Sequence, residues 1–125
     1  MVKLVYCIRR REDVSPEEFR RYWREEHGPL VHSVAGAIGA VRYVQSHTVA
    51  PELNAILRES RGSAEPYDGI TEVWWESLVA LEASMQTPES QDAQRRLLED
   101  ESAFIDVARS AVFMTEEHAI VSSVS

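Results

Sequence analysis

Residues 15–30 read SPEEFRRYWREEHGPL, and this stretch predicts an amphipathic helix with a well-defined start. Ser15 and Glu18 have the spacing of a capping box, in which the serine hydroxyl accepts a hydrogen bond from the backbone N–H of Glu18 and the glutamate reaches back. Pro16 takes the first helical position, where its missing N–H costs nothing. An apolar stripe follows, made of Phe19, Tyr22 and Trp23. A stripe at this spacing predicts that the helix packs against a core.

The end of this helix carries the first candidate catalytic residue. Gly28-Pro29 is a typical helix stop, and it places His27 in the last turn, beside unpaired carbonyls and the negative end of the helix dipole. That position favours the imidazolium and makes His27 a candidate general acid or base near neutral pH. The pattern leaves open the alternative of a solvent-facing histidine with a purely structural role at the helix end.

Four other stretches predict β-strands, because each is rich in apolar and β-branched residues. They are residues 2–8, 40–48, 70–76 and 111–121. Further helical stretches begin after Ser77 and Thr87, both good caps. The order β, α, β, β, α, β is typical of the ferredoxin-like fold, an α+β class with a four-stranded antiparallel sheet and its helices on one face. We expect residues 1–125 to form a single domain, with residues 49–68 as an inserted loop or short helix.

The sheet is expected to be apolar on both faces. In the first strand, Val5 and Cys7 alternate with Leu4, Tyr6 and Ile8. Helices cover only one face in this fold, so the other face needs a partner. A homodimer that packs sheet against sheet is the simplest solution.

Composition excludes several classes of protein. The net charge is −8, and the one basic cluster, residues 9–11, is offset by Glu12 and Asp13, which argues against nucleic acid as a partner. A single cysteine excludes an internal disulfide. We expect a cytoplasmic protein with no membrane partner, because the sequence contains no signal-like or membrane-spanning run. No GxGxxG, HExxH or HxH motif occurs, so no cofactor and no metal are expected.

A second candidate catalytic residue lies on the second strand. There, Tyr43 could hydrogen-bond a substrate oxygen while His27 moves a proton. Two such groups suffice for isomerisation, dehydration or aldol-type cyclisation without a metal or nucleotide. The alternative is that Tyr43 is an aromatic residue that only packs against the helices.

Further residues are candidates for substrate binding: Trp23, His47, Glu72 and Trp75. Trp74 and Trp75 point to opposite faces of the third strand, and the phase of that strand leaves open which of them faces the pocket. A carboxylate at Glu72 on an inner face would need a partner such as Arg42 or His27. The acidic stretch 99–101 is expected to be a solvated face.

Several segments resemble the EthD family in order and spacing. They are VKLVY at 2–6, YWREEHGPL at 22–30, GITEVWW at 69–75, and the tail from FID at 104–106 to TEEH at 115–118. This resemblance implies a dimeric α+β barrel, in which two ferredoxin-like sheets pack together and each protomer keeps a pocket between its sheet and helices. Segment 49–68 is similar to a family-variable insertion.

The resemblance also implies a range of activities. The family and its barrel relatives include muconolactone-type isomerases, polyketide cyclases and dehydratases, cofactor-free monooxygenases and haem-degrading enzymes. The methylmuconolactone isomerase branch uses a histidine at the end of the first helix and a tyrosine on the second strand, which correspond here to His27 and Tyr43. We expect a cofactor-independent acid–base enzyme that binds a small apolar oxygenated metabolite. Two alternatives stay open: a non-catalytic binding or accessory protein of an oxygenase or degradation pathway, and a cofactor-free monooxygenase.

Overall fold

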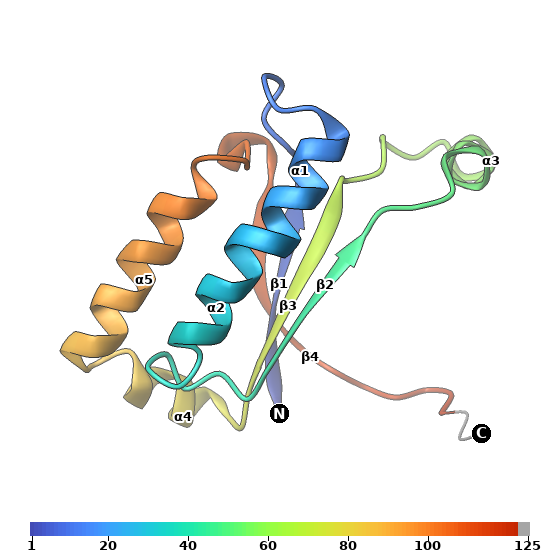
Figure 1. Cartoon of the computed structure of the whole chain (residues 1–125). Coiled ribbons are helices and arrows are strands. Elements are labelled where there is room, and N and C mark those ends of the chain that lie inside the picture. Colours follow the sequence, from blue (N-terminus) through green and yellow to red (C-terminus); the bar gives the residue numbers. More distant parts are fainter. Residues whose placement is uncertain (123–125) are drawn as a thin grey trace.

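A computed structural model describes residues 1–122 of the chain and shows a four-stranded sheet with helices on one side (Figure 1). The elements run in the order β1 (Val2–Ile8), α1 (Pro16–Tyr22), a π-helical turn η1 (Trp23–His27), α2 (Gly28–Val34), β2 (Arg42–His47), α3 (Pro51–Arg61), β3 (Gly69–Trp75), α4 (Leu78–Ser84), α5 (Pro88–Glu101), a 3₁₀ turn η2 (Val107–Arg109) and β4 (Ala111–Glu116). The strands are ordered β2-β3-β1-β4, and every neighbouring pair is antiparallel. The predicted α+β, ferredoxin-like fold is confirmed.

The helices begin where the caps predict. The Ser15 hydroxyl accepts a hydrogen bond from the Glu18 N–H, at 3.1 Å. Ser77 and Thr87 cap α4 and α5 in the same way. These caps satisfy backbone donors that have no partner inside the helix, which is why each helix starts at a defined residue.

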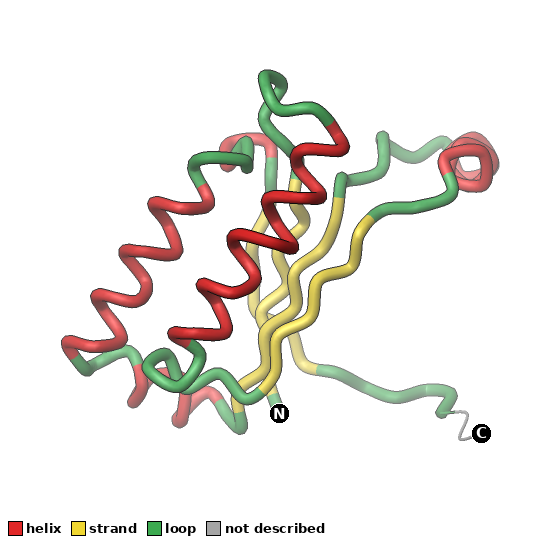
Figure 2. Tube along the Cα trace, viewed as in Figure 1, coloured by secondary structure: helices red, strands yellow, loops and turns green. Residues whose placement is uncertain are grey.

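The predicted helix end at Gly28-Pro29 is wrong. The chain stays helical from α1 through η1 into α2, as Figure 2 shows. Gly28 has φ −54°, and its N–H bonds to the carbonyl of Trp23, five residues earlier. Pro29 has no N–H, and its ring crowds the carbonyl four residues before it, so the wider π turn accommodates the proline without breaking the helix. His27 therefore lies in the middle of a long helix, away from any helix end.

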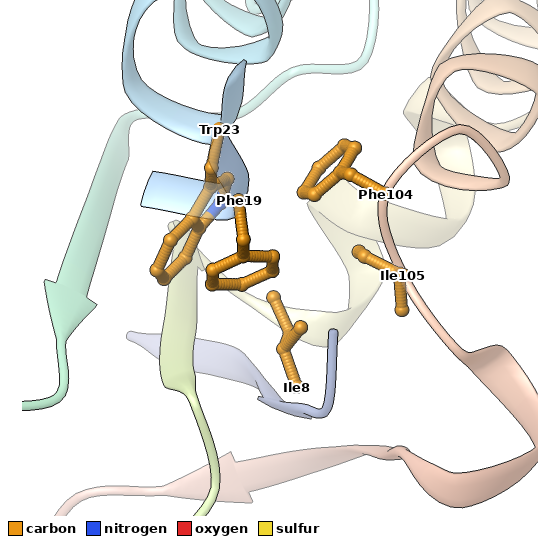
Figure 3. Close-up of a cluster of buried hydrophobic side chains, with 5 residues drawn as sticks. All are labelled: Ile8, Phe19, Trp23, Phe104 and Ile105. Atoms are coloured by element: carbon orange, nitrogen blue, oxygen red, sulfur yellow. The ribbon is translucent and has the colours of Figure 1, made fainter. Parts of the chain in front are cut away.

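The core lies between this long helix and the sheet. Its main cluster contains Ile8, Phe19, Trp23, Phe104 and Ile105, all at most 4 % exposed (Figure 3). Gly69 makes the packing possible, because a Cβ on Gly69 would lie 2.6 Å from Cη2 of Trp23. The indole can thus press directly on the backbone of β3, and this contact fixes the height of η1 above the sheet.

The other face of the sheet is open over residues 1–122. Strand alternation places Val5, Val44, Ile70 and Phe113 there, and the Phe113 side chain is 49 % exposed. In Figure 1, α3 and the segment after β4 extend toward this side, while α1, α2 and α5 cover the opposite one. None of the α3 residues is buried. No helix among residues 1–122 has the length and apolar character needed to cross a membrane.

Candidate active site between the sheet and the helices

A cavity of about 520 Å³ lies between the covered face of the sheet and the helices. Its walls come from β1, β2, β3, β4, the long helix and α5. Six polar side chains line it, and all its other lining residues are apolar. The six are Tyr6, His27, Tyr43, Thr71, Gln94 and Glu101. A larger hollow of about 780 Å³ lies beside α3, but it contains none of these six groups. The smaller cavity is therefore the better candidate site.

His27 is held by a carboxylate. Its side chain is only 6 % exposed, and Nδ1 lies 2.7 Å from Oδ2 of Asp100 on α5. The other carboxylate oxygen accepts a hydrogen bond from the Tyr22 hydroxyl, so Asp100 is fixed from two directions. Because a carboxylate only accepts, the proton of a neutral His27 is assigned to Nδ1 and Nε2 keeps its lone pair. His27 thus lines the cavity as an imidazole with a defined tautomer.

The electrostatics of His27 differ from the expectation drawn from the sequence. Burial lowers the pKa of His27, while the hydrogen bond to Asp100 and the negative charge of that carboxylate act in the opposite direction. The expected stabilisation of the imidazolium by the helix dipole is wrong, because His27 has no helix end beside it. A lowered pKa favours the neutral imidazole, which is the form that accepts a proton.

Tyr43 also lines the cavity. Burial raises the pKa of its phenol, and hydrogen bonding from Gln45 opposes that rise. Gln45 donates to the phenol oxygen at 2.9 Å and to the backbone carbonyl of Trp23 at 2.7 Å, so one amide ties β2 to the π turn. Since the phenol accepts from Gln45, its own O–H remains able to donate to a ligand.

Glu101 is a third titratable group on the cavity wall. Burial, and then the negative charge of Asp100, raises the pKa of Glu101 to about 7. In turn Glu101 acts on Tyr6, whose pKa burial and this carboxylate raise to about 12. A carboxyl that titrates near neutral pH can donate or accept a proton under ordinary conditions.

The sequence did not predict Asp100 or Glu101 as site residues, and the expectation that residues 99–101 form a solvated face is wrong for both. Only Glu99 fits it, with a side chain 66 % exposed and paired with Arg95. Helical spacing contained a signal: Gln94, Leu97 and Glu101 lie three and four residues apart and line the cavity together.

The two tryptophans expected at the site, Trp23 and Trp75, both line the cavity. The Trp75 indole donates to the carbonyl of Ile38 at 2.9 Å, so its ring is fixed. The Trp23 side chain is fully buried, and its Nε1 has no hydrogen-bond partner among residues 1–122. Trp74 lies on the open face, where Arg42 stacks over its ring at 4.7 Å.

His47 stands behind the cavity instead of in its wall. Its ring stacks on Trp23, with centroids 4.3 Å apart, and its Nε2 lies 2.8 Å from Oε1 of Gln45. Burial and the nearby charges of Arg24 and Arg20 lower the pKa of His47. This residue supports Trp23 and Gln45 from outside, so the expected direct contact with a ligand is corrected.

Glu72 lies on the opposite face of the sheet from the cavity. Strand alternation separates it from Thr71 and Val73, which line the cavity. Its carboxylate pairs with Lys3 at 2.5 Å, so the expected partners, Arg42 and His27, are wrong. A substrate contact from Glu72 is incompatible with this position within one protomer.

No metal site is apparent among residues 1–122: they contain no group of three or more His, Cys, Asp or Glu side chains arranged to hold an ion.

Three solved structures illustrate the fold to which this chain is similar. An ethyl tert-butyl ether D (EthD) family protein from Bacillus halodurans is 17% identical with a TM-score of 0.61, over 94% of this chain and 99% of that one. A dimeric protein of unknown function and ferredoxin-like fold from Bacteroides fragilis is 14% identical with a TM-score of 0.58, over 93% and 95%. A candidate antibiotic biosynthesis monooxygenase from Deinococcus radiodurans is 14% identical with a TM-score of 0.53, over 100% of both chains. Identities this low establish the fold alone.

No curated protein matched the chain. The EthD domain matches residues 11–108, which span the long helix, β2, α3, β3, α4 and α5 and end inside η2. That range includes His27, Tyr43, Asp100 and Glu101. The chain therefore belongs to the EthD domain family.

Proposed function

We propose that the protein is a cofactor-independent acid–base enzyme of the isomerase, cyclase or dehydratase type, and that it acts on a small apolar oxygenated metabolite bound in the 520 Å³ cavity. One observation carries the proposal. The buried His27 is oriented by Asp100 at 2.7 Å and lines an apolar space that also holds Tyr43 and Glu101. A base with a fixed tautomer, together with donors for a ligand oxygen, is the minimum set for moving a proton.

The chemistry begins at Nε2 of His27. This nitrogen takes a proton from a carbon next to a carbonyl, the C–H electron pair moves into the carbonyl, and the negative charge collects on its oxygen. Asp100 stabilises the imidazolium that forms, as the carboxylate of a catalytic triad does. Tyr43 donates to the charged oxygen, where a preorganised donor lowers the barrier.

The second half of the reaction returns the proton. For an isomerisation, the His27 imidazolium delivers it to a different atom. For a dehydration, the protonated Glu101 gives its proton to the departing hydroxyl, which leaves as water, and the His27 imidazolium then releases its proton to solvent while Glu101 takes one up, which restores both groups. General acid–base catalysis of this kind contributes roughly 10²–10⁴-fold, so orientation between Trp23 and Trp75 supplies the remainder of the acceleration.

The test compares two histidines in a metabolite screen. Mixtures of uncharged ketones, polyketones and lactones are incubated with wild type, His27→Ala and His32→Ala, and their consumption is followed by mass spectrometry. His32 is exposed on α2 and is the matched control. We expect turnover to disappear in His27→Ala and to persist in His32→Ala, with unchanged circular dichroism.

Unimpaired turnover in a folded His27→Ala variant would contradict the proposal. A ligand that binds equally well to wild type, His27→Ala and Tyr43→Phe, and is never converted, would favour the binding or accessory alternative. Consumption of dioxygen together with the ligand would instead favour the monooxygenase alternative.

The proposed functional unit is a homodimer in which the open faces of two sheets meet. Val5, Ile70 and Phe113 supply apolar contacts on this face, and the similar protein from Bacteroides fragilis is described as dimeric. Exposed apolar side chains on α3, namely Leu53 and Ile56, extend the apolar surface beyond the sheet. An uncovered apolar surface of this kind is typical of an interface between copies of one chain.

A further inference from the structure

The walls of the cavity contain no cation. None of its lining residues is a lysine or an arginine, and the only two that can carry a charge are His27 and Glu101. Small-molecule sites that bind carboxylates or phosphates normally provide an arginine, a lysine or a helix N-terminus for the negative charge. Such a group is missing from the lining of this cavity within residues 1–122.

Four cations on the elements around the cavity interact with groups outside it. Lys3 belongs to β1, but it pairs with Glu72 on the open face. Arg95 belongs to α5, but its guanidinium pairs with Asp92 and Glu99 on the exposed side of that helix. Arg20 and Arg24 belong to the long helix, and their charges lower the pKa of His47, which packs against Trp23.

The charges that reach the cavity are negative. Asp100 is the one charged group that perturbs His27 and also the one that perturbs Glu101. Glu101 adds a second negative charge whenever it is ionised, and this charge raises the pKa of Tyr6 on β1. An anionic ligand would bring a further negative charge into an apolar space, where repulsion is stronger than in water and the lost hydration is not replaced.

The cavity does contain hydrogen-bonding partners and apolar surface for an uncharged oxygenated ligand. The hydroxyls of Tyr6 and Tyr43 can donate to a carbonyl, and Nε2 of His27 can accept from a hydroxyl. Trp23 and Trp75 offer aromatic surface for an apolar ring. A volume of about 520 Å³ lies within the range of ordinary small-molecule sites.

We infer that the cavity selects uncharged ketones and phenols and rejects carboxylates of the same shape, and that Glu101 is the residue responsible for the rejection. This inference rests on the proposed function only in taking the same cavity as the ligand site. It restricts the substrate class: the reacting metabolite enters as a neutral molecule, and an acid would have to be masked as an ester or amide before it could bind.

Two probes with one ring system test the inference. They are 2-acetylnaphthalene, a neutral ketone, and 2-naphthoate, a carboxylate, measured by equilibrium dialysis at pH 8, where Glu101 is ionised. We expect the carboxylate to bind at least about tenfold more weakly than the ketone, because juxtaposed like charges in an apolar space repel each other. In Glu101→Gln we expect the carboxylate to bind more tightly, so that the ratio between the two affinities falls toward one. Glu99→Gln, which removes the same charge from the exposed side of α5, should leave both affinities unchanged.

Equal affinity of wild type for the two probes would overturn the inference, as would a difference that Glu101→Gln and Glu99→Gln alter to the same extent. Binding of neither probe would overturn both the inference and the choice of this cavity as the ligand site. Selective binding of the ketone with no turnover in the metabolite screen would support the inference and discard the proposed acid–base chemistry, so the two can fail separately.

Discussion

The two faces of the sheet are built from the same strands but differ in whether their carboxylates are paired with a cation. Strand β3 supplies both, with Trp75 on the covered face and Trp74 on the open one. On the open face, Glu72 is paired with Lys3 at 2.5 Å. On the covered face, the Glu101 carboxyl is partly buried and pairs with no cation among residues 1–122, and its pKa is raised to about 7.

This difference indicates which face is suited to chemistry and which to assembly. A paired carboxylate beside apolar residues is suited to an interface, where partners hold it in place. An unpaired carboxyl costs stability, and proteins concentrate such groups where they bind or react. The covered face is therefore the candidate for chemistry and the open face the candidate for assembly.

The largest expected effect is on the covered face. In Asp100→Asn we expect turnover to fall roughly 10²–10⁴-fold, because the amide cannot stabilise the imidazolium and can hold the wrong tautomer of His27. The measurement is the pH–rate profile, whose His27 limb should also shift, whereas a purely structural role would leave the profile in place. Asp92→Asn, on the exposed side of the same helix, is the control. Equal rates in Asp100→Asn and wild type would remove the dyad from the mechanism.

The second-largest effect is expected on the open face, where a substitution should change the oligomeric state. We expect wild type to sediment as a dimer and Phe113→Asp to sediment as a monomer, because an unpaired carboxylate buried in an apolar interface costs several kcal/mol. Val79→Asp, at a valine of α4 that is 75 % exposed, should remain dimeric. A wild-type monomer, or a Phe113→Asp variant as dimeric as wild type, would contradict the assignment of this face.

A smaller effect concerns the pH dependence of stability. Between about pH 4.5 and 7 the folded state keeps a proton on Glu101 that the unfolded chain has released, so the contribution of Glu101 to stability falls as the pH rises. His27 acts in the opposite direction: its pKa is lowered from 6.5, so its contribution is lost as the pH falls through that value.

Comparison with Glu101→Gln isolates the carboxyl. We expect the variant to gain stability relative to wild type from pH 4.5 to 8, by roughly 3 kcal/mol at most, as measured by urea unfolding. Both proteins contain His27, so its contribution cancels in the difference. A difference that stays constant over this range would show that Glu101 titrates normally.

The smallest effect is expected for the paired carboxylate. Glu72→Gln breaks the contact with Lys3 on the open face, which should change the free energy of unfolding by about 0–1 kcal/mol and leave turnover unchanged. The measurements are urea unfolding and the rate in the metabolite screen. A large loss of turnover with the dimer intact would mean that Glu72 reaches a site, and the separation of the two faces would be wrong.

The fold could be predicted from the sequence because its signals are local. Ser15, Ser77 and Thr87 cap helices in the structure as their spacing predicts. Alternating apolar residues such as Leu4 and Val5 marked the strands and both apolar faces. Caps and alternation act within a few residues, so one chain contains them in full.

The site could be predicted only in part because it depends on contacts between distant segments. Gly28-Pro29 predicts the end of a helix, and no local sequence signal indicates that a π turn accommodates the proline within a continuous helix. Asp100 lies 73 residues from His27, and the acidic run around it hides which carboxylates face inward. The phase of β3, which places Glu72 outside and Trp75 inside, also depends on its pairing with β1.

The central claim, that His27 moves a proton in this cavity, can be tested before the natural substrate is known. The measurement is exchange of the methyl protons of 2-acetylnaphthalene for deuterium in D₂O, followed by NMR with wild type and His27→Ala. The account predicts that wild type accelerates the exchange above the buffer rate and that His27→Ala does not. An exchange rate that is the same in both proteins, whether at or above the buffer rate, would contradict it.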